Sequence, residues 1–183
     1  MNRIIKADLY RHNELMGLKG FLKGFWRIPG FRYMFLLRKV AESRRFTPKW
    51  IFYSLLKNRY SYKYGFQIPS TTEIGEGFYI GHCGTIVING KAKIGKNCNI
   101  THNVTIGQAN RGKLKGYPII GDNVWIGTGS VIVGNINIGS NVLIAPNSFV
   151  NIDVPENSLV VGNPCKIVYK DNPCEGYINN VLL

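Results

Sequence analysis

The 183-residue sequence predicts a mainly β protein, in which a parallel β-helix of hexapeptide repeats follows an N-terminal α-helical segment. Two observations favour this fold. An aliphatic residue recurs every six positions beyond residue 67, and basic and aromatic residues gather before it. The sequence therefore divides into a basic, aromatic helical segment (1–66), a β-helix (67–170) and a C-terminal tail (171–183).

The six-residue period is the main evidence for the β-helix. It matches neither the 3.6-residue period of a helix nor simple strand alternation. Short strands separated by tight turns fit it, with one aliphatic side chain per strand pointing inward. Gly often follows this residue, as in IGEGFY and IGKNCN, where corners need a permissive backbone. The repeat predicts about four three-stranded coils. Its anchors are Ile68, Ile74, Ile80, Ile86, Ile94, Ile100, Ile106, Ile120, Ile126, Ile132, Ile138, Ile144 and Val150.

The first 66 residues differ sharply in composition from the rest. They hold 15 Lys/Arg against 3 Asp/Glu, a net of +12 out of +13 for the chain. Apolar residues recur at helical spacing, and Pro29 and Pro48 mark the starts of new helices. Interleaved charge and aromatics suit an anionic membrane surface. The alternative is a cap on a trimer whose charges are merely solvated. No nucleic-acid-binding motif accompanies the charge, so nucleic acid is not an expected partner.

The four cysteines, Cys83, Cys98, Cys165 and Cys174, form no CxxC pair and no disulfide-rich framework. We expect reduced thiols in a cytoplasmic protein, with peripheral attachment at the inner membrane face as a second expectation. No apolar run approaches the roughly 18 residues of a membrane-spanning helix, and the first twenty residues lack the apolar stretch of a signal peptide.

Two histidines stand out in the repeat region. His82 and His102 each follow an anchor by two residues, and the 20 positions between them equal three hexapeptides plus a two-residue insertion. We therefore expect the two rings to stack in adjacent coils. Imidazole suits proton transfer near neutral pH; the alternative is a solvated pair without a role. His12 is expected on the surface, and Cys83 as a buried packing residue.

Four stretches resemble the hexapeptide-repeat acyltransferases over about residues 66–170: IGHCGTIVING, NITHNVTIGQANRG, IGDNVWIGTGSVIVGNINIG and VPENSLVVGNPCKIV. The resemblance is to the serine acetyltransferase branch, and within it to colanic-acid-type polysaccharide O-acetyltransferases. It implies a left-handed β-helix, a homotrimer with active sites between neighbouring subunits, and acetyl-CoA as acetyl donor. No metal is expected, since the metal-dependent hydratases of this fold need three histidines.

The resemblance also implies roles for particular residues. His82 lies where serine acetyltransferases carry their catalytic histidine, so it is the predicted general base. His102 would contact the acceptor or steady the site. A backbone N–H near Gly107 would bind the oxyanion, although this glycine could serve only the turn. The predicted contacts to acetyl-CoA are Gly107, Trp125, Thr128, Pro146, Asn151 and Lys166, with Trp125 alternatively a trimer contact.

Three positions decide the predicted acceptor. Gln67, Gly81 and Tyr117 stand where serine acetyltransferases carry two aspartates and a histidine, so charged partners for serine would be lost. We therefore predict acetylation of a hydroxyl on a sugar or lipid-linked glycan in polysaccharide biosynthesis, with Gln67, Tyr117 and Arg111 contacting the acceptor. The basic loop bearing Arg111 could instead be merely solvated. The alternatives are serine O-acetylation for cysteine biosynthesis and a non-catalytic β-helix scaffold.

Overall fold

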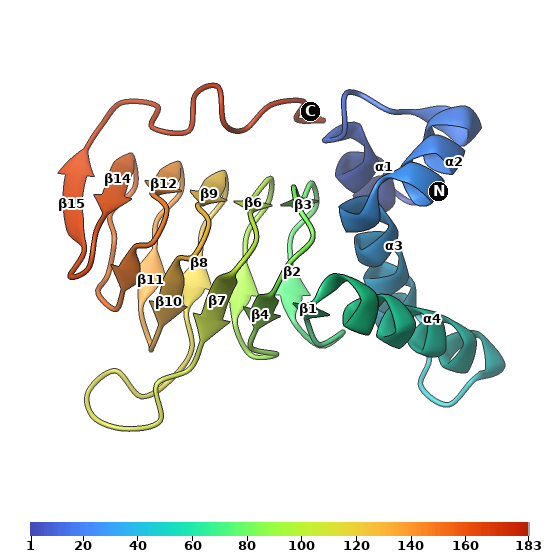
Figure 1. The fold of residues 1–183 in the computed structure, drawn as a ribbon, viewed down its shortest axis with the longest axis horizontal. Helices are drawn as coiled ribbons and strands as arrows, with labels where there is room; N and C mark the ends of the chain where they lie inside the picture. Colours follow the sequence, from blue (N-terminus) through green and yellow to red (C-terminus); the bar gives the residue numbers. More distant parts are fainter. Residues whose placement is uncertain (183) are drawn as a thin grey trace.

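The computed structural model describes residues 1–182, in which a helical bundle adjoins one end of an elongated β-solenoid (Figure 1). The helices are α1 (Arg3–Tyr10), α2 (Gly17–Arg27), α3 (Pro29–Glu42) and α4 (Pro48–Tyr64). Helices α2 to α4 match the predicted ones, whereas α1 was not separately predicted. None of these helices is long and apolar enough to cross a membrane. Leu183, the end of the predicted tail, lies outside the described residues.

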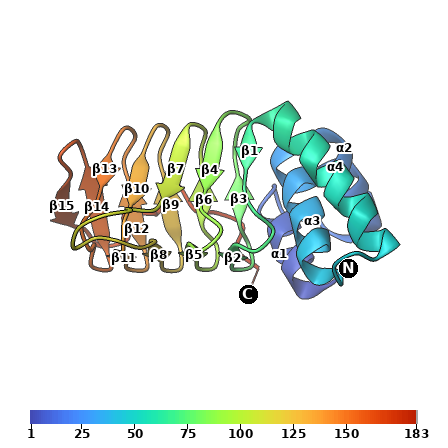
Figure 2. The same ribbon diagram turned by 90° about the horizontal axis from the view of Figure 1, so that it is seen from below.

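The strands form three sheets, which we call A, B and C. Sheet A has the order β1-β4-β7-β10-β13, sheet B the order β11-β8-β5-β2, and sheet C the order β15-β14-β12-β9-β6-β3. Figure 2 shows the strands stacked along the solenoid axis. The strands are β1 (Phe66–Gln67), β2 (Glu73–Ile74), β3 (Tyr79–Ile80), β4 (Ile86–Ile88), β5 (Lys93–Ile94), β6 (Asn99–Ile100), β7 (Val104–Gly107), β8 (Ile119–Ile120), β9 (Val124–Ile126), β10 (Val131–Val133), β11 (Asn137–Ile138), β12 (Val142–Ile144), β13 (Phe149–Val150), β14 (Ser158–Val161) and β15 (Lys166–Tyr169).

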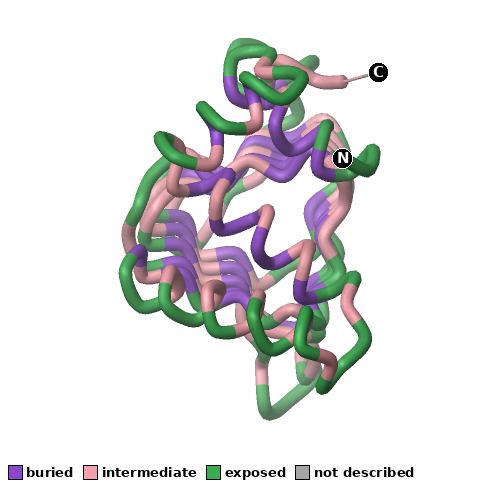
Figure 3. Tube along the Cα trace, turned by 90° about the vertical axis from the view of Figure 1, so that its right-hand side faces the viewer, coloured by how far each residue is buried: buried purple, intermediate pink, exposed green. Residues whose placement is uncertain are grey.

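The predicted parallel β-helix is confirmed, and its aliphatic anchors form the core. All are buried except Ile74, which is half-buried. Figure 3 shows these buried positions as rows inside the solenoid. The solenoid has about five coils rather than the predicted four, since sheet A has five strands. The repeat extends past its recognised anchors, because Phe66 starts sheet A and Val154 and Val160 continue the core after Val150.

The helical segment is fastened to the first coils through α1 and α3. The Tyr33 hydroxyl donates to the carbonyl of Ile68 at 3.2 Å. The buried Arg11 guanidinium donates to the Gly77 carbonyl at 2.8 Å, Asn99 Oδ1 at 2.6 Å and the Asn179 carbonyl at 2.8 Å. Because these three acceptors lie in two solenoid coils and the tail, one side chain joins three parts of the chain.

After β15, which pairs antiparallel to β14, the chain returns along the solenoid toward α1 (Figure 1). The Asn99 side-chain amide donates to the Tyr177 carbonyl at 2.8 Å, and the Tyr177 ring packs on Trp125 with ring centroids 4.8 Å apart. The tail is thus held across the outer side of sheet C. The VVGNPCKIV stretch forms the β14–β15 hairpin.

His12 differs from its expectation as a surface residue. It is buried, with its ring 4.6 Å from that of Tyr79 and 6.1 Å from that of Phe31. Burial and the neighbouring Arg11 charge lower its pKa to about 4, so the ring is neutral at physiological pH. The sequence around His12 gave no sign of this burial, because the contacts join the turn after α1 to α3 and β3.

Glycines set the spacing at the corner between sheets B and C. Gly75, Gly95, Gly121 and Gly139 each follow an anchor and stack in successive coils. The Gly95 N–H donates to the Ile120 carbonyl at 2.9 Å, and a Cβ added at Gly95 would lie 2.5 Å from the Gly121 carbonyl oxygen. The repeat's glycines are therefore required here by close backbone approach.

We predict that Gly95→Ala destabilises the protein by about 3 kcal/mol, because its methyl group would overpack against rigid backbone. Urea unfolding would measure the change. The matched control is Gly112→Ala. There φ is +71° and an added Cβ would have no other group within 4 Å, so only backbone strain of about 1 kcal/mol is expected. Equal losses in the two variants would contradict close coil packing as the cause.

Candidate functional site

The two repeat histidines meet at the corner between sheets C and A, hereafter the C–A corner. Strands β3 and β6 pair Ile80 with Ile100, so the following turns place His82 and His102 in adjacent coils. Their ring centroids are 5.8 Å apart at 87°. His82 is exposed and His102 is half-buried. The predicted stacking is confirmed, and it leaves both imidazoles accessible to a small molecule.

A chain of hydroxyls orients His102. The Thr101 hydroxyl donates to the Ile126 carbonyl at 2.9 Å, and the Thr128 hydroxyl donates to Thr101 Oγ1 at 3.2 Å. Thr128 Oγ1 also lies 3.4 Å from His102 Nδ1. Because a carbonyl only accepts and both hydroxyl protons are used, Nδ1 must be the donor to Thr128. With Nδ1 as the donor, Nε2 is the His102 ring nitrogen that can accept a hydrogen bond.

Three of the predicted acetyl-CoA contacts continue the row that the histidines begin. The Asn147 N–H donates to the Thr128 carbonyl, which places Pro146 one coil beyond Thr128. Lys166 pairs with Val161 at the last C–A corner, and its side chain is exposed. At the usual strand spacing, this row extends about 20 Å from His102 to Lys166. It could hold an extended ligand.

Another group of predicted site residues lies at the corner between sheets A and B, the A–B corner. Gly107 ends β7, and Arg111 is exposed on the loop 108–118 that follows. Arg111 and Asn151 line a shared hollow of about 670 Å³ beneath this loop. Tyr117 closes the loop, where its ring lies 5.2 Å from Lys91 Nζ.

The two corners are separated within one chain by the width of sheet A. Strand β7 runs from Val104, beside His102, to Gly107, which corresponds to about 10 Å. One copy therefore brings His82 and His102 together with Thr128, but it does not bring Gly107 or the basic loop to them. The site in a single chain is divided into two parts.

The remaining predicted residues have other surroundings. Gln67 is exposed at the end of β1, and within residues 1–182 it makes no hydrogen bond to His82. Trp125 lies on sheet C beneath Tyr177 and outside the C–A row. Cys83 is exposed rather than buried as expected, and partial desolvation raises the pKa of its thiol.

The sequence reasoning did not assign a role to Thr101. Its position immediately before His102 could have predicted a role, since it places a hydroxyl at the same corner. Among the described residues, no three His, Cys, Asp or Glu side chains gather closely enough to hold a metal ion.

Comparison with known proteins shows which protein family the chain resembles. The model for bacterial transferase hexapeptide (six repeats) matches residues 117–151. Serine acetyltransferase 3, mitochondrial, of Arabidopsis thaliana is 40% identical over 120 residues, which cover 65% of this chain and 31% of that protein. The chain spans between about a third and a half of the curated relatives it matches.

Solved structures give longer matches. Neisseria gonorrhoeae serine acetyltransferase in complex with serine is 32% identical, with a TM-score of 0.73; the match covers 91% of this chain and 68% of that one. Serine acetyltransferase from Brucella abortus strain S19 in complex with coenzyme A is 26% identical, with a TM-score of 0.75; 92% and 67% of the two chains are covered.

These comparisons correct the predicted acceptor. The expected relationship to colanic-acid-type polysaccharide O-acetyltransferases is not supported, and the predicted sugar or lipid-linked glycan acceptor is wrong, because the matched relatives and structures are serine acetyltransferases. The substitutions at Gln67, Gly81 and Tyr117 therefore do not identify a sugar enzyme. The stacked coils, the repeat and these matches lead to one assignment: the chain belongs to the hexapeptide-repeat transferase family, as a relative of its serine acetyltransferases.

Proposed function

We propose that this chain is a serine O-acetyltransferase of cysteine biosynthesis, which transfers the acetyl group of acetyl-CoA to the hydroxyl of L-serine. The observation that carries the proposal is the pair of accessible imidazoles, 5.8 Å apart, at one corner of a fold matched to serine acetyltransferases. Hydroxyl acetylation needs a base near neutral pH, and imidazole is the side chain suited to it.

The row along the C–A corner supports the choice of donor. The thioester end of acetyl-CoA would lie beside His82 and His102, where the acceptor can reach it. The arm would follow Thr128 and Pro146, and the phosphates would approach Lys166, whose exposed ammonium offers the required charge. A neighbour bound to coenzyme A has the same fold.

The proposed reaction proceeds by direct transfer. His82 accepts the hydroxyl proton as the serine oxygen attacks the thioester carbonyl carbon. The C–S bond then breaks, and the imidazolium returns its proton to the departing thiolate, giving O-acetylserine and CoA. His102, with its Nε2 lone pair free, accepts a hydrogen bond within the same corner and steadies the acceptor. Cys83 takes no part, since its raised pKa keeps it a thiol.

The division of the site supports a homotrimeric assembly. If the A–B corner of a second copy faces the C–A corner of the first, Gly107 and the basic loop reach the histidines that their own chain leaves distant. A backbone N–H near Gly107 would then bind the oxyanion. Arg111 of the second copy would pair with the serine carboxylate, in place of the histidine that Tyr117 has replaced.

Thiol release from acetyl-CoA in the presence of L-serine tests the activity directly. We expect serine-dependent release, reduced by about 10²-fold or more in His82→Ala because proton transfer is lost. Lys96→Ala, an exposed residue at the corner between sheets B and C, is the control and should retain full activity. No serine-dependent release, or release unaffected by His82→Ala, would refute the proposal.

The hydroxyl chain gives a second prediction. Thr128→Val keeps the side-chain shape but removes the acceptor for His102 Nδ1–H, so kcat should fall roughly fivefold for one lost hydrogen bond. Nitrogen NMR of His102 should show the Nδ1-protonated tautomer in the parent protein and a mixture in the variant. Ser43→Ala, which removes the hydrogen bond from the Ser43 hydroxyl to the Lys39 carbonyl at 2.7 Å in the helical segment, is the control and should keep the parental kcat. An unchanged tautomer in Thr128→Val would contradict the assigned orientation.

Mixing two inactive variants tests the shared site. His82→Ala disables the C–A corner and Arg111→Ala impairs the A–B corner, so a mixed trimer regains one intact site. Unfolding and refolding the two together in equal amounts should restore about a quarter of the parental activity in random trimers. Each variant refolded alone serves as control. Mixtures no more active than the average of the two variants would place the whole site within one chain.

A further inference from the structure

Helix α2 presents three distinct rows of side chains. Phe21 and Phe25 are half-buried and pack toward α3. Their ring centroids lie 5.1 and 5.7 Å from that of Phe35. A second row is apolar and exposed, and a third is basic and exposed. The exposed rows each repeat every four residues, so each follows one side of the helix. They are Leu18, Leu22 and Trp26, and Lys19, Lys23 and Arg27.

The glycines of α2 fix which side faces outward. Gly20 and Gly24 are buried, and a Cβ on Gly24 would lie 2.7 Å from Leu9 and 2.9 Å from Phe31. Only a glycine face fits against α1 and α3 at this distance. The helix therefore cannot rotate to bury its apolar row, which stays 75% exposed at Leu18 and 68% exposed at Trp26.

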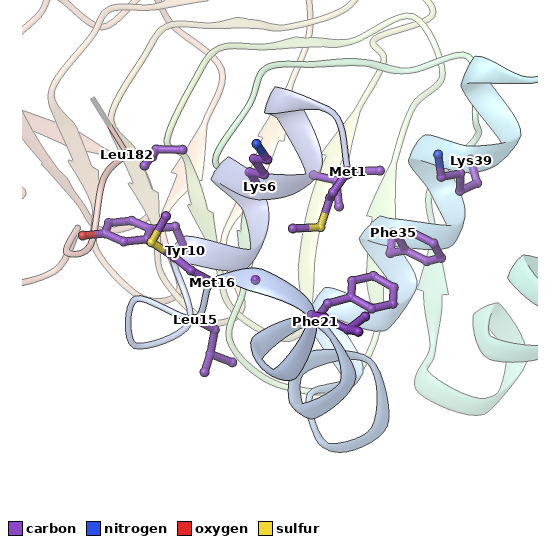
Figure 4. Close-up of a pocket in the computed structure, with 12 residues that line it drawn as sticks. Met1, Lys6, Tyr10, Leu15, Met16, Phe21, Phe35, Lys39 and Leu182 are labelled. Carbon is purple, nitrogen blue, oxygen red and sulfur yellow. The ribbon is translucent and has the colours of Figure 1, made fainter.

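The apolar surface continues into a pocket at the start of α2. Met16, Leu18 and Phe21 are among the residues that line this pocket, whose volume is about 630 Å³. Figure 4 shows Met16 and Phe21 in its lining. Its lining is almost entirely apolar, and its only charged members among the described residues are Lys6 and Lys39. Lys39 is paired with Glu42 at 2.8 Å, whereas the row Lys19, Lys23 and Arg27 adjoins the apolar surface. Exposed apolar groups, an adjoining apolar hollow and this basic row fit a molecule with acyl chains and an anionic head.

We propose that α2 docks on an anionic lipid bilayer, with Leu18, Leu22 and Trp26 entering the interface and Lys19, Lys23 and Arg27 contacting the lipid headgroups. A fixed amphipathic helix with Trp and Leu on one side and cations beside them is the arrangement such binding needs. Helix α2 contains no acidic residue, and residues 1–66 carry a net +12. The surrounding charge therefore attracts anionic lipid.

A second copy of this chain fits the same surface less well. A symmetric contact would place each α2 against itself. It would then bring Lys19, Lys23 and Arg27 close to the identical cations of the partner copy. Like charges across such a contact are unfavourable, whereas an anionic bilayer neutralises the same row.

Vesicle flotation tests the proposal on the full chain. We expect binding to phosphatidylcholine vesicles that contain about 30% phosphatidylglycerol, no binding to phosphatidylcholine alone, and weaker binding as salt rises above about 0.15 M. Leu18→Ser/Leu22→Ser/Trp26→Ser should reduce binding at least about tenfold, because it removes the apolar row. Replacing Lys19, Lys23 and Arg27 with Gln should have a similar effect.

Matched controls remove equivalent groups from elsewhere. Val168→Ser/Tyr169→Ser removes two exposed apolar side chains from β15, at the far end of the solenoid (Figure 1). A Gln triple variant of Lys93, Lys96 and Lys170 removes three exposed charges outside α2. Both should bind vesicles like the parent. Circular dichroism would verify that every variant is folded.

Three outcomes would overturn the proposal. The first is no binding to anionic vesicles, and the second is equal loss in α2 and control variants. The third is a drop in oligomer size caused by the Ser triple variant without vesicles, which would make the α2 surface a subunit contact. Trp26 emission provides an independent readout: it should shift to the blue on vesicle addition, and Trp26→Phe should abolish the shift.

Discussion

Backbone stacking between successive coils is the constraint on which the rest of the molecule depends. Each glycine at the corner between sheets B and C donates its N–H to the next coil, as Gly121 does to Ile138 at 2.8 Å. This contact fixes the coil spacing, and the coil spacing fixes the register of every strand. Inward anchors then fill the core, since Ile80, Ile100 and Ile126 lie over one another in neighbouring coils.

The candidate site follows from this stacking and needs little else. Because the register pairs Ile80 with Ile100 and Ile100 with Ile126, side chains two positions later fall into one row. His82, His102 and Thr128 are those side chains. The solenoid thus converts a sequence spacing into the geometry of the candidate site, and the width of sheet A separates this row from the basic loop. A rigid strand cannot shorten to bring them together, which is why the proposed site needs a second copy.

The repeat made most of the solenoid predictable from the sequence, including the pairing of His82 with His102, because each coil depends only on its neighbours. Features fixed by single long-range contacts were not predictable. His12 is buried through contacts with β3, and the tail is held by Arg11 and Trp125 from distant parts of the chain. No local pattern encodes such contacts. The acceptor was wrongly predicted because the three substitutions, taken alone, remove charged partners that the proposed assembly would replace.

The substitutions change how a charged acceptor could be held. Gln67 offers an amide oxygen and Gly81 offers no side-chain oxygen where serine acetyltransferases carry aspartates, so in the proposed function the ammonium of serine would lose ionic partners. The basic loop would supply a strong partner for the carboxylate through Arg111. Binding would then rest more on the carboxylate than on the ammonium. It follows that the loop, rather than the start of sheet A, would discriminate serine from hydroxyl compounds that lack a carboxylate. Because that loop belongs to the A–B corner, acceptor recognition and proton transfer would be contributed by different copies of the chain.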